Sequence, residues 1–384
     1  MGKHRLSEQT SDMTTRLRRL AVLFGAAGIV LVAISGWTAW RAYQDIERVP
    51  FEDSAAAAEV LRTIPASEVD NLRAAEDAAE EADRLAAEQE LEAEELAELK
   101  ARREEARTQV EIEIPFVTSP ELPDEMFTSY LLVGVEGGFR ADAIIYLLQP
   151  ADGSPPIMLS LPRDLYLGNP CTQRYTRINA GLGGCAGYAG GAELLSLMVK
   201  EFTGIEVDRF ARVDFGGFEQ VIDALGGVEI CVEHAVRDAK SFLDLPAGCS
   251  RADGSQALAW VRSRHTEQLV DGAWQSVPGV SDFTRQRKQQ DMLFKIAGRL
   301  NSFSSLASFS SVASSLADTV ALDSGFSFGD AVSLAWKFRG TDASDVKRVS
   351  IPVRDYVTSA GAYVLVPTAT FNEALVKVYP AAAR

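Results

Sequence analysis

The stretch from Ala257 to Gln290, ALAWVRSRHTEQLVDGAWQSVPGVSDFTRQRKQQ, combines the apolar side of a helix with a group of cationic side chains. Its first residues predict a short buried helix that ends near Arg262. A loop rich in Gly and Pro should follow, and then a second helix that carries Arg285. The cationic residues of the stretch are Arg262, Arg264, Arg285, Arg287 and Lys288. This arrangement is expected to gather several guanidinium groups around one point.

Clustered arginines require an anion, because like charges about 4 Å apart repel by roughly 1 kcal/mol in water and by about 4 kcal/mol at an effective dielectric of 20. The guanidinium fork matches phosphate oxygens two at a time, and each charge-assisted bond contributes about 1.5–3 kcal/mol. We therefore predict a phosphate or pyrophosphate site. The alternative is a set of ordinary surface ion pairs. The carboxylates available for such pairs are Glu267, Asp271, Asp282 and Asp291.

The N-terminal region contains an uncharged segment, LAVLFGAAGIVLVAISGWTAW from Leu20 to Trp40, in a chain of 384 residues with a net charge of -16. About 20 helical residues cross the roughly 30 Å hydrocarbon core of a bilayer, so we expect a single transmembrane helix over residues 20–43. A signal peptide is the alternative, but aromatic residues follow where a small-residue cleavage site should lie. Basic residues precede the segment, which predicts a cytoplasmic tail over residues 1–19 and a body outside the cell membrane.

Four cysteines, Cys171, Cys185, Cys231 and Cys249, all lie in the expected outer body, where disulfides persist. Three pairings are possible. We favour Cys171 with Cys185 and Cys231 with Cys249, because each pair closes a short loop and contributes roughly 3 kcal/mol. A metal site is a weaker interpretation, since no CxxC pair exists and no histidine lies at ligand spacing. Free buried thiols are the other alternative.

Residues 44–118 are acidic and rich in Ala and Glu, as in AAEDAAEEADRLAAEQELEAEELAELKARREEAR. These residue types are strong helix formers, and Glu98 with Arg102 shows the spacing at which two side chains share a helix face. The leucines keep no sustained heptad, so a strong coiled coil is not supported. We expect a charged helical stalk that spaces the body from the membrane, with disorder or weak self-association as the alternatives.

From residue 119 onward, short apolar runs alternate with Gly, Pro and polar turns. The runs that predict buried strands are Tyr130–Val135, Ala143–Leu148, Ile157–Leu161, Val228–Val232 and Val346–Val353. The segments that predict helices are 194–202, 218–225, 285–300, 306–316 and 328–338. Strands and helices mixed in this way give an α/β body with helices packed on a central sheet. We expect the catalytic domain over residues 119–356 and a C-terminal extension over residues 357–384.

Several function classes have no support in the sequence. The protein is acidic overall and its arginine cluster lacks a broad basic face, so nucleic acid is not an expected partner. The stretch GVEGGF does not supply a GxGxxG fingerprint, and no GKS or GKT follows a glycine loop. Serine-hydrolase chemistry lacks a GxSxG motif.

Six stretches taken together closely resemble the LytR–CpsA–Psr family of bacterial cell-envelope proteins, in order and in spacing. They are LLVGVEGGFRADAIIYLL, SLPRDLYL, TRINAGLGGCAG, VDFGGFEQVIDALGGVEI, ALAWVRSR and SDFTRQRKQQ. The resemblance runs from about Ser129 to Val353 and implies a three-layer α/β/α body with a central mixed sheet. It also implies a membrane-anchored transferase that moves a glycopolymer from a polyprenyl-pyrophosphate carrier to peptidoglycan through a phosphodiester, assisted by Mg²⁺.

The resemblance also assigns roles to particular residues. The positions that match the family's catalytic motifs are Arg140, Asp142, Arg163, Asp164, Arg262, Arg264, Asp282, Arg285 and Gln289. Asp142 would hold Mg²⁺ together with Glu136, which stands where the family usually has an aspartate. Lys288 stands where an arginine is usual, and we interpret it and Arg287 as solvated charges of a helix face. Asp164 is our candidate for the base that takes the acceptor's proton, and His265 is interpreted as structural.

The polyprenyl chain needs an apolar groove, because each buried methylene contributes about 0.8 kcal/mol. The candidates for its lining are Met198, Phe202, Phe210, Phe215, Phe218, Val221 and Ile222. Helical spacing makes each of them an ordinary core residue as well. Two other functions stay open at this point: a phosphatase in which water attacks the pyrophosphate, and an envelope scaffold that binds lipid without turnover.

Overall fold

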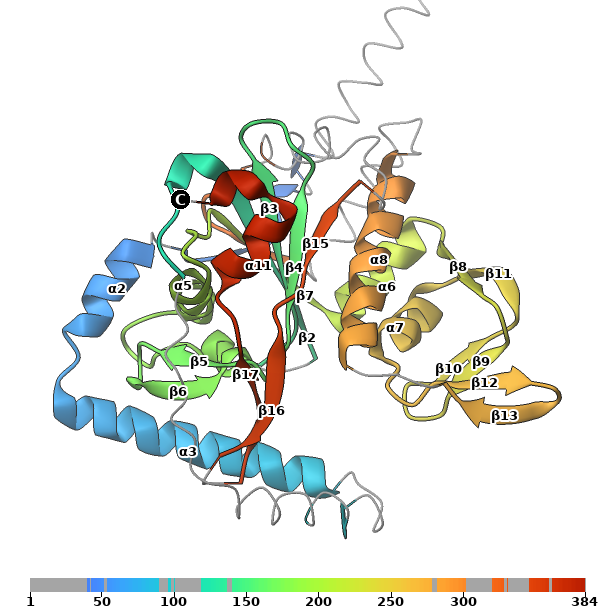
Figure 1. Cartoon of the computed structure of the whole chain (residues 1–384), viewed down its shortest axis with the longest axis horizontal. Helices are drawn as coiled ribbons and strands as arrows, with labels where there is room; N and C mark the ends of the chain where they lie inside the picture. The colour runs from blue at the N-terminus through green and yellow to red at the C-terminus, as the bar shows by residue number, and fades with distance from the viewer. Residues whose placement is uncertain are drawn as a thin grey trace, which may run out of the picture.

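The body is organised around a seven-stranded mixed sheet in this computed structural model (Figure 1). The structure describes residues 40–41, 43–51, 54–89, 96–97, 100, 119–136, 140–277, 282–301, 320–327, 330, 345–358 and 361–383. In sheet order, the strands are β1 Glu47–Val49, β14 Val320–Asp323, β7 Arg209–Asp214, β2 Phe127–Val135, β3 Ala141–Pro150, β4 Ile157–Leu161 and β15 Lys347–Val349. Strand β3 pairs antiparallel with both β2 and β4, whereas β7 pairs parallel with β2. The carboxyl ends of β2, β4 and β7 therefore lie at the same edge of the sheet.

Both faces of this sheet are covered, as alternate residues of its central strands show. Leu131 and Val133 of β2 belong to the largest core cluster, whereas Tyr130 belongs to a second cluster. Along β3, Tyr146 belongs to the first cluster and Ile145 to the second. Successive side chains of a strand point to opposite faces, so the two clusters lie on opposite sides of the sheet. The buried strands predicted at Tyr130–Val135, Ala143–Leu148 and Ile157–Leu161 are confirmed, whereas the run Val346–Val353 forms a strand only over Lys347–Val349 before β16 begins at Val353.

Helices form the two outer layers. The elements packed on the first face include α5 (Gly191–Thr203), α11 (Phe371–Val378) and the 3-10 helix η2 (Ile178–Gly183). On the other side lie α6 (Phe215–Ala224), α7 (Gly254–Arg262) and α8 (Asp282–Asn301). Leu293 and Phe294 of α8 pack against the second cluster. The α/β fold with a central mixed sheet is therefore as expected.

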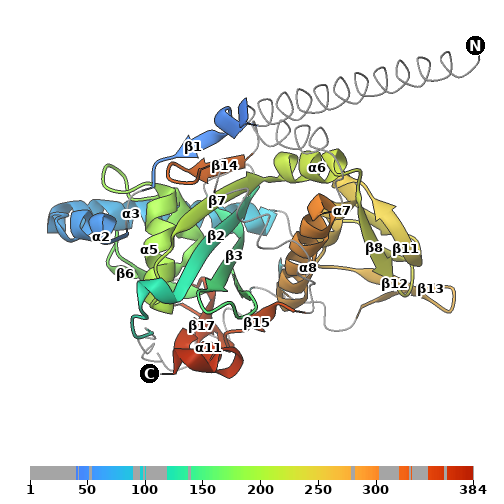
Figure 2. The same cartoon turned by 90° about the horizontal axis from the view of Figure 1, so that it is seen from above.

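Beyond α6, α7 and α8, small strands form an annex with its own apolar cluster (Figure 2). Its strands are β8 Val228–Val232, β9 Val236–Asp238, β10 Leu243–Leu245, β11 Gly248–Ala252, β12 Glu267–Val270 and β13 Ala273–Ser276. The predicted loop between α7 and α8 is wrong in one respect, because it contains the β12–β13 hairpin. Asp271 and Gly272 connect these strands with positive φ angles of 51° and 77°, as two-residue hairpin turns require.

Both favoured disulfide pairings are confirmed. Cys171 joins Cys185, and Cys231 joins Cys249. The second bridge links two residues that face each other in the antiparallel pair of β8 and β11. The first anchors the loop after β5 (Tyr166–Asn169) to the segment after η2.

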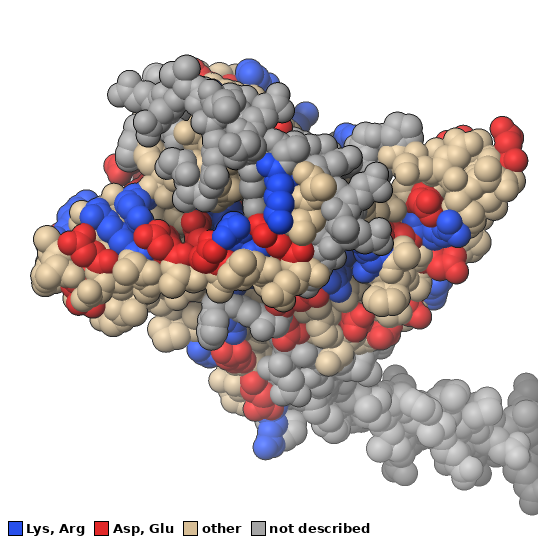
Figure 3. Space-filling view, turned by 90° about the horizontal axis from the view of Figure 1, so that it is seen from below, with Lys and Arg blue, Asp and Glu red and all other residues tan. Residues whose placement is uncertain are grey.

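Residues 44–118 do not form the continuous helix that their composition predicts, because Glu47–Val49 are strand β1 of the main sheet, and the described part of this segment does not stand away from the body. Helices α2 (Ser54–Arg62) and α3 (Ala66–Gln89) lie against the body, with α3 crossing beneath β5 and β6 (Arg174–Arg177) (Figure 1). Seen from below, basic and acidic side chains gather together in a band on this side of the molecule (Figure 3). The residues of this segment that join the main core are Leu61, Ile64, Val69 and Leu72. The spacer prediction is therefore wrong for these two helices, because their apolar side chains are part of the core.

The C-terminal segment of the chain packs into the body, whereas the predicted N-terminal membrane helix lies mostly outside the described residues. The predicted C-terminal extension is part of the body: β16 (Val353–Val357) pairs with β17 (Tyr363–Pro367), and Phe371 of α11 is fully buried. The predicted transmembrane helix falls almost wholly on residues 20–39, outside the described part. Among the helices that are described, none has the length and hydropathy to span a bilayer. The helices expected at 306–316 and 328–338 also fall outside it, apart from Asp330.

Docking of α3 predicts a difference between two leucines of the same helix. Leu72 is 9% exposed in the core, whereas Leu85 is 47% exposed. Leu72→Ala should lower the free energy of unfolding by about 2 kcal/mol, because a buried Leu→Ala change costs about 2–5 kcal/mol. Leu85→Ala should change it by less than about 0.5 kcal/mol. Urea unfolding of the full chain, followed by tryptophan fluorescence, measures both. Equal small effects would mean that α3 does not pack on the body.

Candidate functional site

A pocket of about 400 Å³ lies at the carboxyl ends of β2, β4 and β7, between the sheet and helices α6, α7 and α8. Its apolar lining residues include Leu132, Ile145, Phe215, Phe218, Leu258, Val261, Met292 and Leu293. Its charged and titratable lining residues include Glu136, Asp142, Arg163, Asp214, Asp238, Lys240, Arg262, Arg264, His265 and Arg285. Apolar and charged surface thus share one cavity. Binding sites in α/β sheets commonly occur at this strand edge.

Helix α7 delivers Arg262 to the pocket. Its N-cap is Asp253, whose carboxylate accepts a hydrogen bond from the backbone N–H of Gln256 at 2.9 Å. Arg262 is its last residue and places Nη2 2.5 Å from Glu136 Oε1, just after β2. The guanidinium carbon lies 4.8 Å from the centre of the Phe215 ring. A cation over an aromatic face is favourable, so Arg262 is held by both a carboxylate and a ring.

Helix α6 presents aromatic side chains to the same cavity. Its N-cap is Asp214, whose Oδ1 accepts the backbone N–H of Gly217 at 2.6 Å. Phe215 and Phe218, three residues apart on one helix face, both line the pocket. The helix ends before Gly226 and Gly227, whose positive φ angles of 73° and 84° suit glycine.

A second ion pair joins the strands on the sheet side. Arg163 follows β4, and its Nη1 lies 2.9 Å from Oδ1 of Asp142 in β3. Asp142 Oδ2 also accepts the backbone N–H of Glu136 at 3.2 Å. Asp142, one of the two expected metal ligands, thus contacts the backbone of the other, Glu136, and the carboxylate of each contacts an arginine of the pocket.

The α8 wall combines polar and apolar side chains. Arg285, Gln289 and Met292 recur at helical spacing and all line the pocket. Arg285 is buried, with only 6% of its surface exposed. The next amide, that of Gln290, donates to Ser160 Oγ of β4 at 2.8 Å within the core. This bond fixes α8 against the sheet.

The interpretation of Lys288 as a solvated charge is wrong. Its Nζ lies 4.0 Å from the centre of the Trp260 ring and 3.3 Å from Thr266 Oγ1. Burial lowers the pKa of Lys288 to about 8, although the charge of Asp238 acts in the opposite direction. Arg287, by contrast, is exposed as predicted. Lys288 thus joins α8 to α7 from inside.

Asp238, at the end of β9, is a site residue that the sequence reading missed. It is 2% exposed, and Oδ2 accepts from Ser263 Oγ at 2.7 Å and from the backbone N–H groups of Arg264 at 3.1 Å and His265 at 2.9 Å. Oδ1 accepts from the backbone N–H groups of Lys240 and Ser241. Burial acts to raise its pKa, but these hydrogen bonds outweigh burial and lower it. An aspartate followed by a turn was the available signal, and it is a weak one.

The pocket gathers most of the predicted charged residues, but not all of them. Of the predicted catalytic set, the side chains that line it are Asp142, Arg163, Arg262, Arg264, Arg285 and Gln289. The lining drawn from the described residues does not include Arg140 or Asp164. The prediction for Asp282 concerns a side chain outside the described part, although α8 begins at that residue.

Of the residues predicted to contact the lipid, some line the pocket and the others lie in the hydrophobic cores. Phe215 and Phe218 line the pocket. The residues placed instead in the hydrophobic cores are Met198, Phe202, Phe210, Val221 and Ile222. Helical spacing indicates that such residues face inward, but it does not distinguish a core from a cavity.

Residues 88–377 match the model of the LytR_cpsA_psr family. The chain is a member of the LytR–CpsA–Psr family. Its relatives include the probable cell wall biosynthesis protein LcpB of Corynebacterium glutamicum, 40% identical over 33% of this chain and 29% of the relative. The cell wall biosynthesis protein LcpA of the same organism is 29% identical over 58% of this chain and 45% of its own. The chain thus spans less than half the length of both.

A third relative carries a more specific name. The polyisoprenyl-teichoic acid–peptidoglycan teichoic acid transferase TagV of Bacillus subtilis is 27% identical over 63% of this chain and 59% of its own. Among solved structures, a LytR-Csp2A-Psr enzyme from Actinomyces oris is 25% identical with a TM-score of 0.53, covering 70% of this chain and 94% of that one. The crystal structure of B. subtilis TagV also gives a TM-score of 0.53 at 23% identity, covering 68% and 97%. The chain therefore has the family fold.

The hydrogen bonds of Asp238 predict a pH-dependent effect of Asp238→Asn. At neutral pH the variant should lose about 1–3 kcal/mol of unfolding free energy, because an amide nitrogen cannot accept the bonds of the oxygen it replaces. The folded-state pKa lies below the usual 3.8, so the stabilisation by Asp238 is complete above that value and disappears as the pH falls through the folded pKa. Urea unfolding at a series of pH values measures the gap between the two proteins. A gap that stays constant down to about pH 2 would contradict this account.

Proposed function

We propose that the chain transfers a glycopolymer from a polyprenyl-pyrophosphate carrier to peptidoglycan, forming a phosphodiester. The observation that carries the proposal is the pocket itself, in which several arginines share one cavity with apolar helix and strand side chains. Such a lining suits an amphiphile whose charged pyrophosphate is joined to a hydrocarbon chain. The names of TagV and of the related B. subtilis transferase TagT support the same class of reaction.

In the proposed reaction, an acceptor hydroxyl oxygen attacks the phosphorus that carries the glycan. A new phosphorus–oxygen bond forms, the bond to the bridging oxygen breaks, polyprenyl monophosphate leaves, and the hydroxyl proton is released. Phosphoryl transfer requires alignment and charge neutralisation more than covalent help from the protein. The side chains proposed to contact the phosphates are Arg163, Arg262, Arg264 and Arg285.

The donor set of Asp142 and Glu136 fits Mg²⁺. Magnesium is usually held by one or two carboxylates together with substrate phosphates and water. Asp142 and Glu136 both line the pocket, and the side chain of Glu136 is 52% exposed. When bound, the ion would reduce the negative charge of the pyrophosphate.

We also propose that the segment Leu20–Trp40 anchors the protein in the cell membrane, with the N-terminus in the cytoplasm and the body outside. The charge asymmetry around the segment supports this orientation. The two disulfides support an oxidising compartment for the body, because thiols stay reduced in most cytosolic proteins.

The arginine role predicts a large effect of Arg262→Ala on transfer. The full chain in detergent is incubated with a polyprenyl-pyrophosphate glycan, a peptidoglycan acceptor, and either Mg²⁺ or EDTA, and mass spectrometry follows the glycan phosphate. Transfer should require Mg²⁺ and fall about a hundredfold or more in the variant, because one donor to the developing charge is typically worth about 10²–10³ in rate. Arg287→Ala is the matched control, since that arginine is exposed on α8 and does not line the pocket among the described residues.

Other products would identify the alternative functions. Release of glycan phosphate without transfer, with the acceptor present, would indicate a phosphatase. Binding of the lipid with neither transfer nor release would favour the scaffold and refute the proposed transfer. Equal loss of activity in Arg262→Ala and Arg287→Ala would refute the specific role of Arg262.

A further inference from the structure

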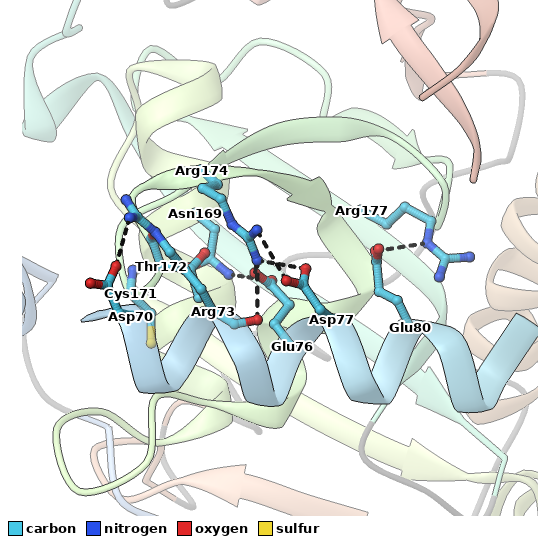
Figure 4. Close-up of polar contacts among 10 residues, drawn as sticks. All are labelled: Asp70, Arg73, Glu76, Asp77, Glu80, Asn169, Cys171, Thr172, Arg174 and Arg177. Carbon is cyan, nitrogen blue, oxygen red and sulfur yellow. Dashed lines mark hydrogen bonds and ion pairs between the residues drawn. The ribbon is translucent and has the colours of Figure 1, made fainter. Parts of the chain in front are cut away.

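Helix α3 is fastened to the β5–β6 hairpin by a row of polar contacts (Figure 4). Arg174 of β6 places Nη2 2.8 Å from Asp77 Oδ1 and 3.4 Å from Glu76 Oε2. Glu76 Oε1 also accepts from Asn169 Nδ2 at 3.1 Å, and Arg73 Nε donates to the carbonyl oxygen of Thr172 at 2.8 Å. These contacts, together with the buried Leu72, attach α3 to the body.

Arg177, the last arginine of this row, contacts two carboxylates, one on α3 and one near the pocket. Arg177, at the end of β6, places Nε 3.7 Å from Oε1 of Glu80 on α3. Its Nη1 lies 3.7 Å from Oδ1 of Asp164, which follows β4. These separations are those of ion pairs rather than of hydrogen bonds. One arginine thus connects the docked helix with the segment that carries the pocket's Arg163.

The ion pairs continue from Asp164 into the pocket. Asp164 Oδ2 lies 3.6 Å from Arg163 Nε, and Arg163 Nη1 lies 2.9 Å from Asp142 Oδ1. The result is a chain of alternating charges, which we name the Glu80–Asp142 chain and which consists of Glu80, Arg177, Asp164, Arg163 and Asp142. It begins on α3 and ends at two residues that line the pocket.

All five side chains of this chain are partly buried. Their exposed fractions are 25% for Glu80, 18% for Arg177, 23% for Asp164, 30% for Arg163 and 27% for Asp142. Charges withdrawn from water are screened less than surface charges, so each pair can orient the next. By comparison, the pair of Arg62 and Glu59 on α2 is 75% and 74% exposed, a setting in which ion pairs contribute little.

We propose that Glu80 is a positioning residue, which acts through Arg177 and Asp164 to hold Arg163 in its anion-binding orientation. When the charge of Glu80 is removed, Asp164 is the one carboxylate of the Glu80–Asp142 chain that still contacts Arg177. Arg177 would then draw Asp164 away from Arg163. The residues that match the family model begin at 88, so Glu80 precedes the matched region. The anion site of the body therefore depends on a helix from the N-terminal segment.

The proposal also gives Asp164 a role other than the base expected from sequence. Its two oxygens face Arg163 and Arg177, and it is not among the described residues that line the pocket. Asp164 therefore links two arginines.

This proposal rests on the proposed function in so far as the bound anion is a pyrophosphate, and it is tested with inorganic pyrophosphate and Mg²⁺ by calorimetry on the full chain in detergent. Glu80→Gln should weaken binding about threefold to tenfold, since charges within one network commonly couple to this extent. If the negative charge of Glu80 acted on the pyrophosphate anion only by long-range repulsion, then removing that charge would tighten binding instead. Glu80→Asp, which keeps the charge, should recover at least part of the affinity.

The matched control is Glu76→Gln, one turn earlier on α3. Glu76 is 13% exposed and also binds β6, but its arginine partner does not contact Asp164 in the described structure. The affinity of the Glu76→Gln variant for pyrophosphate should stay within about twofold of that of the wild type. Equal weakening of pyrophosphate binding in Glu80→Gln and Glu76→Gln would show that only docking of α3 matters. It would overturn the proposed role of the Glu80–Asp142 chain.

A double-mutant cycle tests the route. If Glu80 acts through Asp164, then Glu80→Gln should have no further effect on pyrophosphate binding in an Asp164→Asn background. A wild-type chain that fails to bind pyrophosphate would refute the proposed function. In that case the unfolding free energies of Glu80→Gln, Asp142→Asn and the double variant decide the inference, because strictly additive changes would overturn it and non-additive changes would support it.

Discussion

Asp238 is the buried carboxylate on which the arrangement of the pocket depends. It accepts hydrogen bonds from the turn that follows α7 and from the turn that follows β9, so it fixes one relative to the other. Arg262 and Arg264 flank the anchored Ser263, and their backbone positions follow from these bonds. A buried acceptor with this many donors is expensive to disturb, because each lost bond leaves an unsatisfied group away from water. The backbone that carries Arg264 is therefore tied to Asp238, which itself lines the pocket.

The arginines of the pocket also need compensation in the absence of an anion. Glu136 contacts Arg262, and Asp142 contacts Arg163, so two of the pocket's arginines pair with carboxylates of the same pocket. An incoming pyrophosphate would compete with these carboxylates for the guanidinium groups. A divalent cation bound by the carboxylates would relieve that competition, because it would replace the positive charge that the carboxylates lose when the arginines bind the anion. Under the proposed function, the arginines would bind the anion while the carboxylates bind the cation.

Much of this architecture was predictable from sequence, and the exceptions have physical reasons. Continuous apolar runs identified β2, β3 and β4, and motif order identified the residues of the arginine group. The β12–β13 hairpin was missed although Asp271 and Gly272 are a strong hairpin signal. Phe202 and Phe210 are candidates for either a groove or the core, because periodicity indicates that a residue is buried but not what covers it, and the structure places both in the core. The role of Asp238 is hard to predict because four of its five hydrogen-bond donors are backbone N–H groups, which every sequence contains, and the fifth is the hydroxyl of Ser263.

The acidic helical segment shows how composition alone misleads. Its high content of Ala and Glu satisfies the criteria for a free charged helix, and α3 is indeed helical over Ala66–Gln89. A few apolar side chains, among them Val69 and Leu72, are nevertheless enough to dock one face on the body, after which the acidic face meets Arg174 and Arg177 of β6. Carboxylates of α3 compensate the charge of these arginines at the interface, where 36% of the Arg174 side chain and 18% of the Arg177 side chain remain exposed. Charge on this helix is therefore part of its interface with the body, and the same interface leads through Asp164 toward the pocket.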